Sequence, residues 1–493
     1  MKIIRIHPSD NVAVALSPVT KGESLSICDL SLTAREDIPQ GHKFALNCIA
    51  AGQPVVKYGF PIGAAKEEIA PGQWVHTHNV KTRLSGELEY TYQPAGIDPL
   101  PAAEPASFMG YLRNDGRAAV RNELWIIPTV GCVNSVAEQL VQRNQHLVQG
   151  SIDGLYAFPH PYGCSQMGDD HENTKKLLCA LARHPNAGGV LVLGLGCENL
   201  TMAQFKEELG DWDEERVKFL TCQEVSDEYE EGGKLLEQLA QYAGQFRRQR
   251  LPASKLIIGM KCGGSDGLSG ITANPTVGAF SDLLIAQGGS TILTEVPEMF
   301  GAETILMDRC QTTELFEKTV SLINDFKRYF EEHHQTIYEN PSPGNKAGGI
   351  STLEDKALGC TQKSGFAPVK DVLKYGQKVE KQGLNLLSAP GNDLVAATAL
   401  AASGSQIVLF STGRGTPFAS PVPTIKIASN ETLANKKSNW IDFNAGRLLS
   451  GMELPELAQD LMDYVIRVAS GEQVCSEKNG YHDLAIFKTG VTL

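Results

Sequence analysis

Short apolar runs separated by turns fill the first ninety residues of the chain. The segments MKIIRIH, NVAVALS and PVVKYGF alternate or run apolar over a few residues, and the turns KGES, PQGH and APGQ interrupt this region. Short runs with a period near two are typical of β-strands, and helical periodicity is weak here. The pattern predicts a small all-β domain over residues 1–93.

A different pattern begins after a proline-rich stretch. Residues 94–107 read PAGIDPLPAAEPAS, with few large apolar side chains, which predicts a linker. Beyond it, apolar runs that end in glycine-rich loops, such as NELWIIPTVGC and SQIVLFSTGRG, alternate with amphipathic segments. Apolar residues at helical spacing indicate helices over 235–246, 315–330 and 457–468. This alternation predicts layered α/β domains with Rossmann-like parallel strands.

The chain is therefore expected to be an α/β multidomain protein with a small β domain at its start. Its 493 residues exceed what one hydrophobic core usually serves. We divide it into the β domain (1–93), the linker (94–107), an α/β domain (108–335) and a C-terminal α/β domain with glycine-rich loops (336–493). The polar stretch 332–365 is too long for a simple connection, and such loops are usually functional.

Charge and composition narrow the class of protein. The 57 Asp and Glu outnumber the 44 Lys and Arg, so a net charge of -13 opposes nucleic acid as the main partner. No apolar run reaches the roughly 18 residues that a membrane helix needs. The 11 cysteines are scattered, and the first residues carry charge where a signal peptide is apolar. We expect a cytoplasmic protein that binds a small molecule; a homo-oligomer is compatible with the sequence.

Two groups of residues are candidate metal ligands. In WVHTHN, strand alternation would place His76 and His78 on one face, about 7 Å apart, as two ligands or as one ligand and one acid or base. Two exposed histidines at a strand edge would show the same spacing. Glycine-rich loops also hold Cys164, Cys197, Cys262 and Cys360, which could meet around iron or an iron–sulfur cluster. No CxxC pair supports a cluster, and small buried cysteines are common.

Other polar residues are candidates for binding an anionic substrate and for proton transfer. Ser265 and Asp266 lie in the loop CGGSDGLSG, and Arg414 lies between two glycines, an arrangement that suits small anions. Arg121 ends a series of arginines spaced four apart, which would give a carboxylate a partner or form a solvated face. Spacing does not rank the acid/base candidates: Glu295 and Glu298 follow an expected strand, His160 and His171 flank the Cys164 loop, and Lys346 and Lys356 lie in the long polar stretch.

Taken together, the longer motifs resemble one known family. They look like the motifs of the altronate/galactarate dehydratase family, and within it of the branch that acts on altronate. The motifs that carry the resemblance are WVHTHN, RNELWIIPTVGCVN, HPYGCSQMGDDH, CGGSDGLSGITANP, LTEVPEMFGAE and NPSPGNKAGGISTLEDKALGCTQKSG. The resemblance runs from the first residue to the last. It implies an N-terminal SAF-type (β-clip) domain that holds His76 and His78, followed by a larger α/β part.

The resemblance also implies an activity, a hydro-lyase in hexuronate breakdown that converts D-altronate to 2-dehydro-3-deoxy-D-gluconate with Fe(II) or Mn(II). Such chemistry needs a base at C2–H, an acid at the C3 hydroxyl and a cation near the carboxylate. We assign the sites as follows: His76, His78, Glu295 and Lys346 as catalytic; Arg121, Ser265, Asp266, Asn345 and Arg414 as substrate-binding; His76 and His78 as metal ligands, with Cys164, Cys197 and Cys262 around an iron–sulfur cluster as the alternative.

The expected place of the site is the junction between the first domain and the α/β body. Dehydration of galactarate or another sugar acid is the alternative activity. A non-catalytic sugar-acid binding protein is disfavoured, since no basic helix-turn-helix-like segment offers an output. An oxidoreductase is disfavoured because no GxGxxG follows an expected strand.

Overall fold

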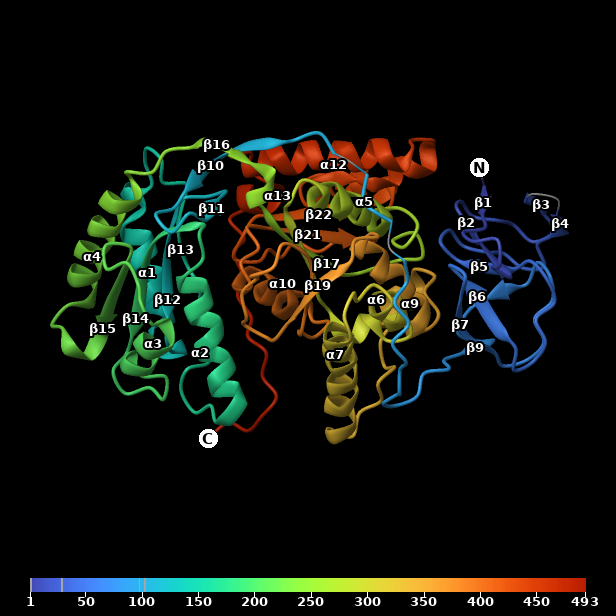
Figure 1. The fold of residues 1–493 in the computed structure, drawn as a ribbon, viewed down its shortest axis with the longest axis horizontal. Coiled ribbons are helices and arrows are strands. Elements are labelled where there is room, and N and C mark those ends of the chain that lie inside the picture. The colour runs from blue at the N-terminus through green and yellow to red at the C-terminus, as the bar shows by residue number, and fades with distance from the viewer. Residues whose placement is uncertain (1, 28–29, 97, 102) are drawn as a thin grey trace.

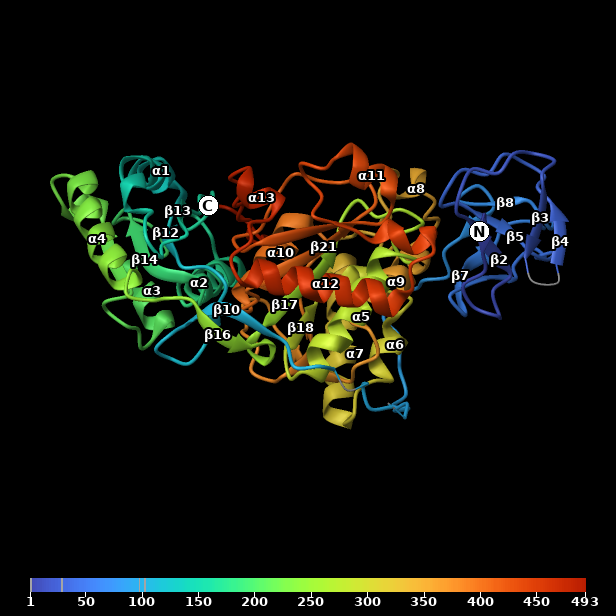
Figure 2. The ribbon, with the colours of Figure 1, turned by 90° about the horizontal axis from the view of Figure 1, so that it is seen from above.

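The protein is described by a computed structural model that covers residues 2–27, 30–96, 98–101 and 103–493. Three bodies follow one another in space, with the C-terminal domain between the first domain and the second (Figures 1 and 2). Among the described residues, the helices lack the combination of length and apolar character that crossing a bilayer requires.

The first domain is all β, as predicted, and its described residues contain no helix. One antiparallel sheet has the order β1-β2-β5-β8, another the order β6-β7-β9, and β3 and β4 form a hairpin. The strands are β1 (Ile3–Ile4), β2 (Val12–Ala15), β3 (Ser24–Ile27), β4 (Leu30–Thr33), β5 (Lys43–Ala45), β6 (Pro54–Lys57), β7 (Phe60–Ala65), β8 (Trp74–Val75) and β9 (Val80–Lys81). The sheets enclose small apolar cores of valine, isoleucine and alanine.

The proline-rich segment after this domain runs along the C-terminal domain (Figure 1). Its described residues form no strand or helix before Ser107, and residues 97 and 102 of the expected linker lie outside the described residues. The Ala95 backbone N–H donates a hydrogen bond to the Asp308 carbonyl, the Ala106 backbone N–H donates one to Gln287 Oε1, and Leu100 packs against the large apolar core. The segment is therefore bound to the body along its length.

The second domain is a parallel sheet covered by helices on both faces. Its order is β13-β12-β14-β15, built from β12 (Glu123–Pro128), β13 (Gly154–Ala157), β14 (Ala187–Gly194) and β15 (Val217–Thr221). Helices α1 (Asn134–Arg143) and α4 (Glu228–Ala243) share one core with the sheet, and α2 (Gly168–Ala182) and α3 (Met202–Leu209) share the other. Strand alternation assigns the residues: Leu124 and Ile126 belong to the first core, Trp125 and Ile127 to the second.

A seven-stranded parallel sheet forms the C-terminal domain. Its order is β19-β20-β18-β17-β21-β22-β23, and these strands are β17 (Ile257–Cys262), β18 (Ser290–Leu293), β19 (Val369–Leu373), β20 (Gly383–Leu387), β21 (Ile407–Thr412), β22 (Thr424–Ala428) and β23 (Phe443–Asn444). Its helices are α5 (Ala273–Ala286), α6 (Glu303–Met307), α7 (Thr313–Glu332), α8 (Pro343–Ala347), α9 (Leu353–Thr361), α10 (Asp393–Ala402), α11 (Glu431–Lys436), α12 (Leu454–Ala469) and α13 (Cys475–Lys478). A small antiparallel sheet of β10 (Ser107–Leu112), β11 (Ala118–Ala119) and β16 (Gln249–Pro252) lies between the two α/β domains.

The boundary expected at residue 335 does not follow this sheet. Strands β17 and β18 pair with β20 and β21, so residues from about 253 onward belong to the C-terminal domain. Apolar patterning reveals that a segment is a strand, but the partner of the strand is decided by packing between distant segments. The polar stretch 332–365 is not a connection between domains, since it contains α8 and α9.

Helix α9 joins the first domain to the C-terminal domain. The Lys43 ammonium lies 2.8 Å and the Lys57 ammonium 3.1 Å from the two carboxylate oxygens of Asp355, and all three side chains are almost completely buried. Ala357 and Leu358 of α9 lie in the same apolar cluster as the first domain's valines. Burial alone would raise the pKa of Asp355, but the two ammonium groups hold that pKa well below its usual range.

Replacing Asp355 by alanine is expected to detach the first domain from α9. The change leaves two buried ammonium groups without a counter-charge, which typically costs about 3–5 kcal/mol. Limited proteolysis within residues 84–106 and thermal unfolding measure the effect. Asp325→Ala, on the exposed side of α7, is the matched control. Equal cleavage rates for Asp355→Ala and the wild type would contradict this role of the ion pair.

Candidate functional site

Two cysteines and a glutamate converge at the carboxyl edge of the large sheet. Cys262 ends β17, Glu298 lies in the short helix Val296–Met299 after β18, and Cys360 lies in the last turn of α9. The two Sγ atoms are 3.3 Å apart, and Glu298 Oε2 lies 3.2 Å from Cys262 Sγ and 3.1 Å from Cys360 Sγ. All three side chains are buried. Ligands in open parallel sheets gather at this edge.

Lysines surround this cluster and set its protonation. Lys356, one turn before Cys360, places its ammonium 2.7 Å from Glu298 Oε1. Burial would raise the pKa of Glu298, but Lys356 and Lys363 lower it to about 2. The contact with Cys262, together with burial, raises the pKa of the Cys360 thiol well above its usual range. Near neutral pH the cluster therefore consists of a carboxylate and at least one protonated thiol.

The donor set fits a divalent metal. The two Sγ atoms and Glu298 Oε2 all lie within 3.3 Å of one another, so the three atoms can bind the same ion. Thiolate sulfur suits Fe(II) and Zn(II), and a metal displaces thiol protons as it binds, which relieves the raised pKa of Cys360. The group Cys262, Glu298 and Cys360 is thus a candidate metal centre.

Glu295 contacts the backbone of Cys262, one of the three residues of this centre. The Glu295 backbone has φ 68°, a left-handed conformation that is uncommon for a residue with a side chain. The carboxylate lies 3.1 Å from the Lys261 ammonium and 3.2 Å from the Lys363 ammonium, and it accepts a hydrogen bond from the Cys262 backbone N–H. Strain of this kind persists where surrounding contacts impose it, often at functional sites. These contacts hold the end of β17 in place.

A small cavity of about 10 Å³, roughly the room for one water, opens beside Cys360 and Lys356. Tyr58 of the first domain forms one wall. Its ring reaches so close to the body that a Cβ at Gly270 would lie 2.3 Å from the hydroxyl oxygen. Tyr58 also has a left-handed backbone, with φ 60°. The first domain therefore contributes a side chain to the cavity beside the candidate metal centre.

Three of the residues expected to bind substrate gather around this cavity. Ser265 and Asp266 line it, and Asn345 donates a hydrogen bond to the Ser265 carbonyl. The Ser265 hydroxyl is buried without a partner among the described residues. Asp266 accepts hydrogen bonds from Ser269, Ser429 and Asn430. The free hydroxyl of Ser265 leaves a donor for a ligand at this position.

The expected strand placement of His76 and His78 is wrong, because both histidines lie in a turn that follows β8. Asn79 shapes this turn by accepting a hydrogen bond from the His76 backbone N–H and donating one to the Trp74 carbonyl. The Trp74 indole contacts both imidazoles, at ring-centre distances of 5.4 Å to His76 and 5.3 Å to His78. The two imidazoles are therefore neighbours because both contact the Trp74 ring, not because they alternate along a strand.

The two imidazoles differ in their surroundings. His76 is buried, its Nδ1 has no partner among the described residues, and burial followed by the nearby Lys43 charge lowers its pKa to about 3. His78 is exposed. His42 packs edge-on against His76, and its Nε2 lies 3.2 Å from the Ala347 carbonyl. His76 is therefore a neutral imidazole at the junction between the first domain and α8.

The remaining candidates lie at different places. Arg414 is exposed beside α8, with Nη1 3.4 Å from the Gly344 carbonyl, and Lys346 lies on α8 itself. Arg121 is buried elsewhere: Glu477 and three backbone carbonyls accept hydrogen bonds from all of its nitrogens. No donor of Arg121 is left for a substrate, so its place argues for a structural role. Spacing along the sequence could not reveal this partner.

The alternative cysteine group is not brought together. Cys164 and Cys197 are exposed in loops of the second domain, whereas Cys262 is buried in the C-terminal domain. Among the described residues, the cysteines that meet in a candidate metal group are Cys262 and Cys360. All three loops are rich in glycine, but they belong to domains built on two different sheets. Glu298 and Lys356 were acid/base candidates that the sequence could not rank, and Lys363 and Tyr58 were not candidates at all, because only folding brings these four residues to Cys262.

Comparisons with known proteins agree with this architecture. The family profiles "Altronate/galactarate dehydratase SAF domain", "D-galactarate dehydratase/Altronate hydrolase, second domain" and "D-galactarate/Altronate dehydratase, C-terminal" match residues 1–83, 110–244 and 253–492. Their limits coincide with the three bodies. The chain belongs to the altronate/galactarate dehydratase family.

Individual relatives match over the whole length. An altronate dehydratase of Bacillus subtilis (strain 168) is 57% identical over 495 residues, with 99% of each chain covered. An altronate dehydratase of Escherichia coli (strain K12) is 55% identical, with 100% of each covered. A galactarate dehydratase (L-threo-forming) of the same strain is 34% identical and covers 98% of this chain and 96% of its own.

Cys262→Ser or Cys360→Ser is expected to weaken Fe(II) or Zn(II) binding by more than about 100-fold. Even outer partners of metal ligands contribute 10- to 100-fold, and these changes remove a sulfur donor itself. Competition with a colorimetric chelator under anaerobic conditions measures the affinity. Cys164→Ser and Cys197→Ser are matched controls with expected wild-type affinity. Loss of binding in the controls instead would place the metal in the second domain.

Proposed function

We propose that the protein is a hydro-lyase that removes water from D-altronate to give 2-dehydro-3-deoxy-D-gluconate in hexuronate breakdown. The reaction takes the proton from C2 and the hydroxyl from C3, and the resulting enol ketonises. The observation that carries the proposal is the Cys262, Glu298 and Cys360 centre, which lies beside a polar cavity in a chain 57% identical to an altronate dehydratase throughout.

We assign the cofactor as Fe(II) or Mn(II), with Cys262, Glu298 and Cys360 as its ligands. Two sulfur donors favour Fe(II) over Mn(II), which prefers oxygen. Bound there, the cation would polarise the substrate carboxylate and so make the C2 proton more acidic. Two converging cysteines are fewer than the thiolates that an iron–sulfur cluster normally takes, so a single ion is the better fit.

The chain's own residues supply the proton transfers in this proposal. We assign His76 as the base because its buried Nδ1 has no partner among the described residues. Burial lowers its pKa to about 3, which makes it a weak base, so the acidity of the C2 proton would have to come chiefly from the cation on the carboxylate. We assign Lys356 as the proton donor to the departing C3 hydroxyl because it lines the cavity; the Glu298 carboxylate keeps it charged but also raises its pKa, which weakens it as an acid. Glu295 forms ion pairs with two lysines and accepts a hydrogen bond from the Cys262 backbone N–H, and we assign it to positioning Cys262. Lys346 and exposed His78 remain proposed contacts at the rim.

Substrate contacts follow from the arrangement around the cavity. We propose that Ser265, Asp266 and Asn345 meet the hydroxyl groups and that Arg414 and Lys346 meet the carboxylate. A cavity the size of one water does not admit a six-carbon acid. The substrate therefore reaches Cys360 and Lys356 after the α8 segment has moved aside, since the buried ion group of Asp355 holds the first domain in place.

Purified protein is expected to convert D-altronate to a 2-keto-3-deoxy acid only with added Fe(II) or Mn(II). The periodate–thiobarbiturate colour of the product measures turnover, and a chelator is expected to abolish it because the carboxylate then lacks its Lewis acid. Galactarate serves as the second substrate in the same assay. Metal-loaded protein that leaves altronate unchanged would rule out the proposed activity, and a preference for galactarate would move it to the other branch of the family.

Lys356→Ala is expected to lower kcat on altronate by about 10²- to 10⁴-fold, the range for loss of a general acid. Circular dichroism and bound metal show whether the fold and the centre persist. Lys318→Ala, an exposed lysine of α7, is the control with wild-type kcat. A kcat within about twofold of wild type in Lys356→Ala would assign proton donation to another residue.

A further inference from the structure

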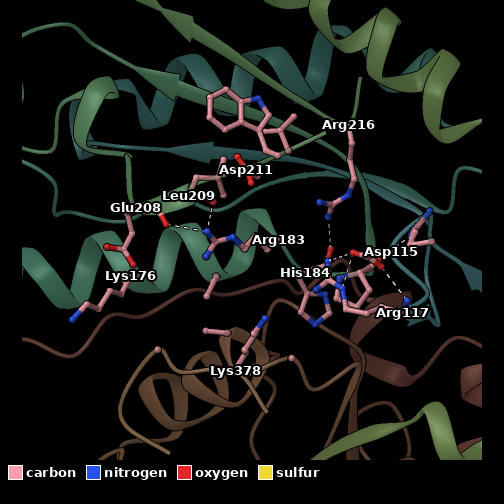
Figure 3. A pocket seen from close by; sticks show the side chains of 18 of the residues that line it. Asp115, Arg117, Lys176, Arg183, His184, Glu208, Leu209, Asp211, Arg216 and Lys378 are labelled. Atoms are coloured by element: carbon pink, nitrogen blue, oxygen red, sulfur yellow. Dashed lines mark hydrogen bonds and ion pairs between the residues drawn. The ribbon is translucent and has the colours of Figure 1, made fainter. Parts of the chain in front are cut away.

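A second, much larger cleft lies between the second domain and the C-terminal domain. It has a volume of about 900 Å³. Helix α2, the α3–β15 loop and the β10–β11 turn form one wall, and residues 374–380 after β19 form the other (Figure 3). It shares no lining residue with the cavity beside Cys360. Figure 1 shows α2 on the side of the C-terminal domain away from the first domain.

Cations gather on both walls of this cleft, although the chain as a whole is acidic. Its basic lining residues are Arg113, Arg117, Lys176, Arg183, Arg216, Lys374 and Lys378. Among the described residues, only Arg117 of this group has a carboxylate within 4.0 Å, that of Asp115 at 2.6 Å. The other six make no ion pair within that limit. Seven basic residues face five acidic lining residues, so the cleft has a formal excess of two positive charges.

Except for Arg117, the arginines of the cleft donate to backbone carbonyls and pair with no carboxylate in the part of the chain that the structure describes. Arg216 donates to the carbonyls of His184, at 2.6 Å, and Ala187, at 3.1 Å. Burial and then the neighbouring Arg117 charge lower the pKa of Arg216 to about 10. Burial and then Arg216 lower the pKa of Arg113 to about 9. Crowded guanidinium groups repel one another where water is scarce, so a bound anion would stabilise the arrangement.

The acidic residues of the cleft do not remove this excess. Asp213 accepts a hydrogen bond from the Tyr242 hydroxyl at 2.5 Å, and its other oxygen accepts one from the Glu215 backbone N–H. Glu208 lies 4.0 Å from Lys175, which is not a lining residue. Asp211 and Glu380 are exposed. Lys378 approaches from the C-terminal domain, opposite Arg183 and Lys176 of the second domain (Figure 3).

We propose that this cleft binds a small oxyanion that carries at least two negative charges, of the phosphate or carboxylate class. Its volume falls within the range of small-molecule sites. Guanidinium forks recognise both classes of oxyanion, and two charged groups on one ligand can meet cations on both walls. The two domains also touch through hydrogen bonds at the cleft: His184 Nε2 bonds to the Ser405 carbonyl, and the Asn186 side-chain amide donates to the Gln406 carbonyl. The bound ligand therefore bridges the two domains away from the site of dehydration.

Titration calorimetry and thermal unfolding with pyrophosphate and with citrate test this site on the full chain, and the two probes separate phosphate from carboxylate chemistry. At least one of them is expected to bind and to raise the unfolding temperature. In the double variant Lys374→Glu/Lys378→Glu the affinity is expected to fall by about tenfold or more, because two attractive charges become repulsive. Both lysines are exposed, so the variant should fold.

Two control variants distinguish binding in this cleft from binding elsewhere on the protein. Lys21→Glu changes an exposed lysine of the first domain and is expected to leave the affinity unchanged. Lys356→Ala reports binding in the active-site cavity and is also expected to leave the affinity unchanged. The proposal is overturned if neither probe binds, if the double variant binds as well as wild type, or if Lys356→Ala removes binding.

Discussion

The buried ion group of Asp355 with Lys43 and Lys57 is the interaction on which the candidate active site depends. It fixes the first domain against α9, and the same helix carries Lys356 and Cys360. A carboxylate and two ammonium groups without water are stable only while all three remain together. The position of Tyr58 at the cavity, one residue after Lys57, follows from this attachment.

Charge pairing continues from this interface into the centre. Lys356 keeps Glu298 ionised, and Lys363 and Lys261 flank Glu295. Negative charge at Glu298 and a polarisable sulfur at Cys262 and Cys360 are what a divalent cation requires. The same lysines hold the acidic groups in place before any metal arrives. The site is therefore an electrostatic network in which protein cations and a metal would share a small number of anionic groups.

Parts of this arrangement could be predicted from the sequence. The β domain, the parallel strands and the glycine-rich loops follow from local apolar periodicity, which reflects which side chains must leave water. Cys262, Ser265 and Asp266 are predictable because a loop after a buried strand lies at the edge where ligands bind. The fate of Arg121 was not predictable, since Glu477 lies 356 residues away in the chain.

The sequence by itself determined the family, the kinds of domain and the residue types available for dehydration, because these are written in local patterns and long motifs. Only the tertiary structure decided which cysteines meet, that Glu298 and Lys356 join them, and that His76 and His78 lie in a turn and both contact Trp74. It also decided that β17 is the first strand along the chain to join the large sheet. The physical reason is that charge pairing and strand pairing act between segments whose distance along the chain carries no signal.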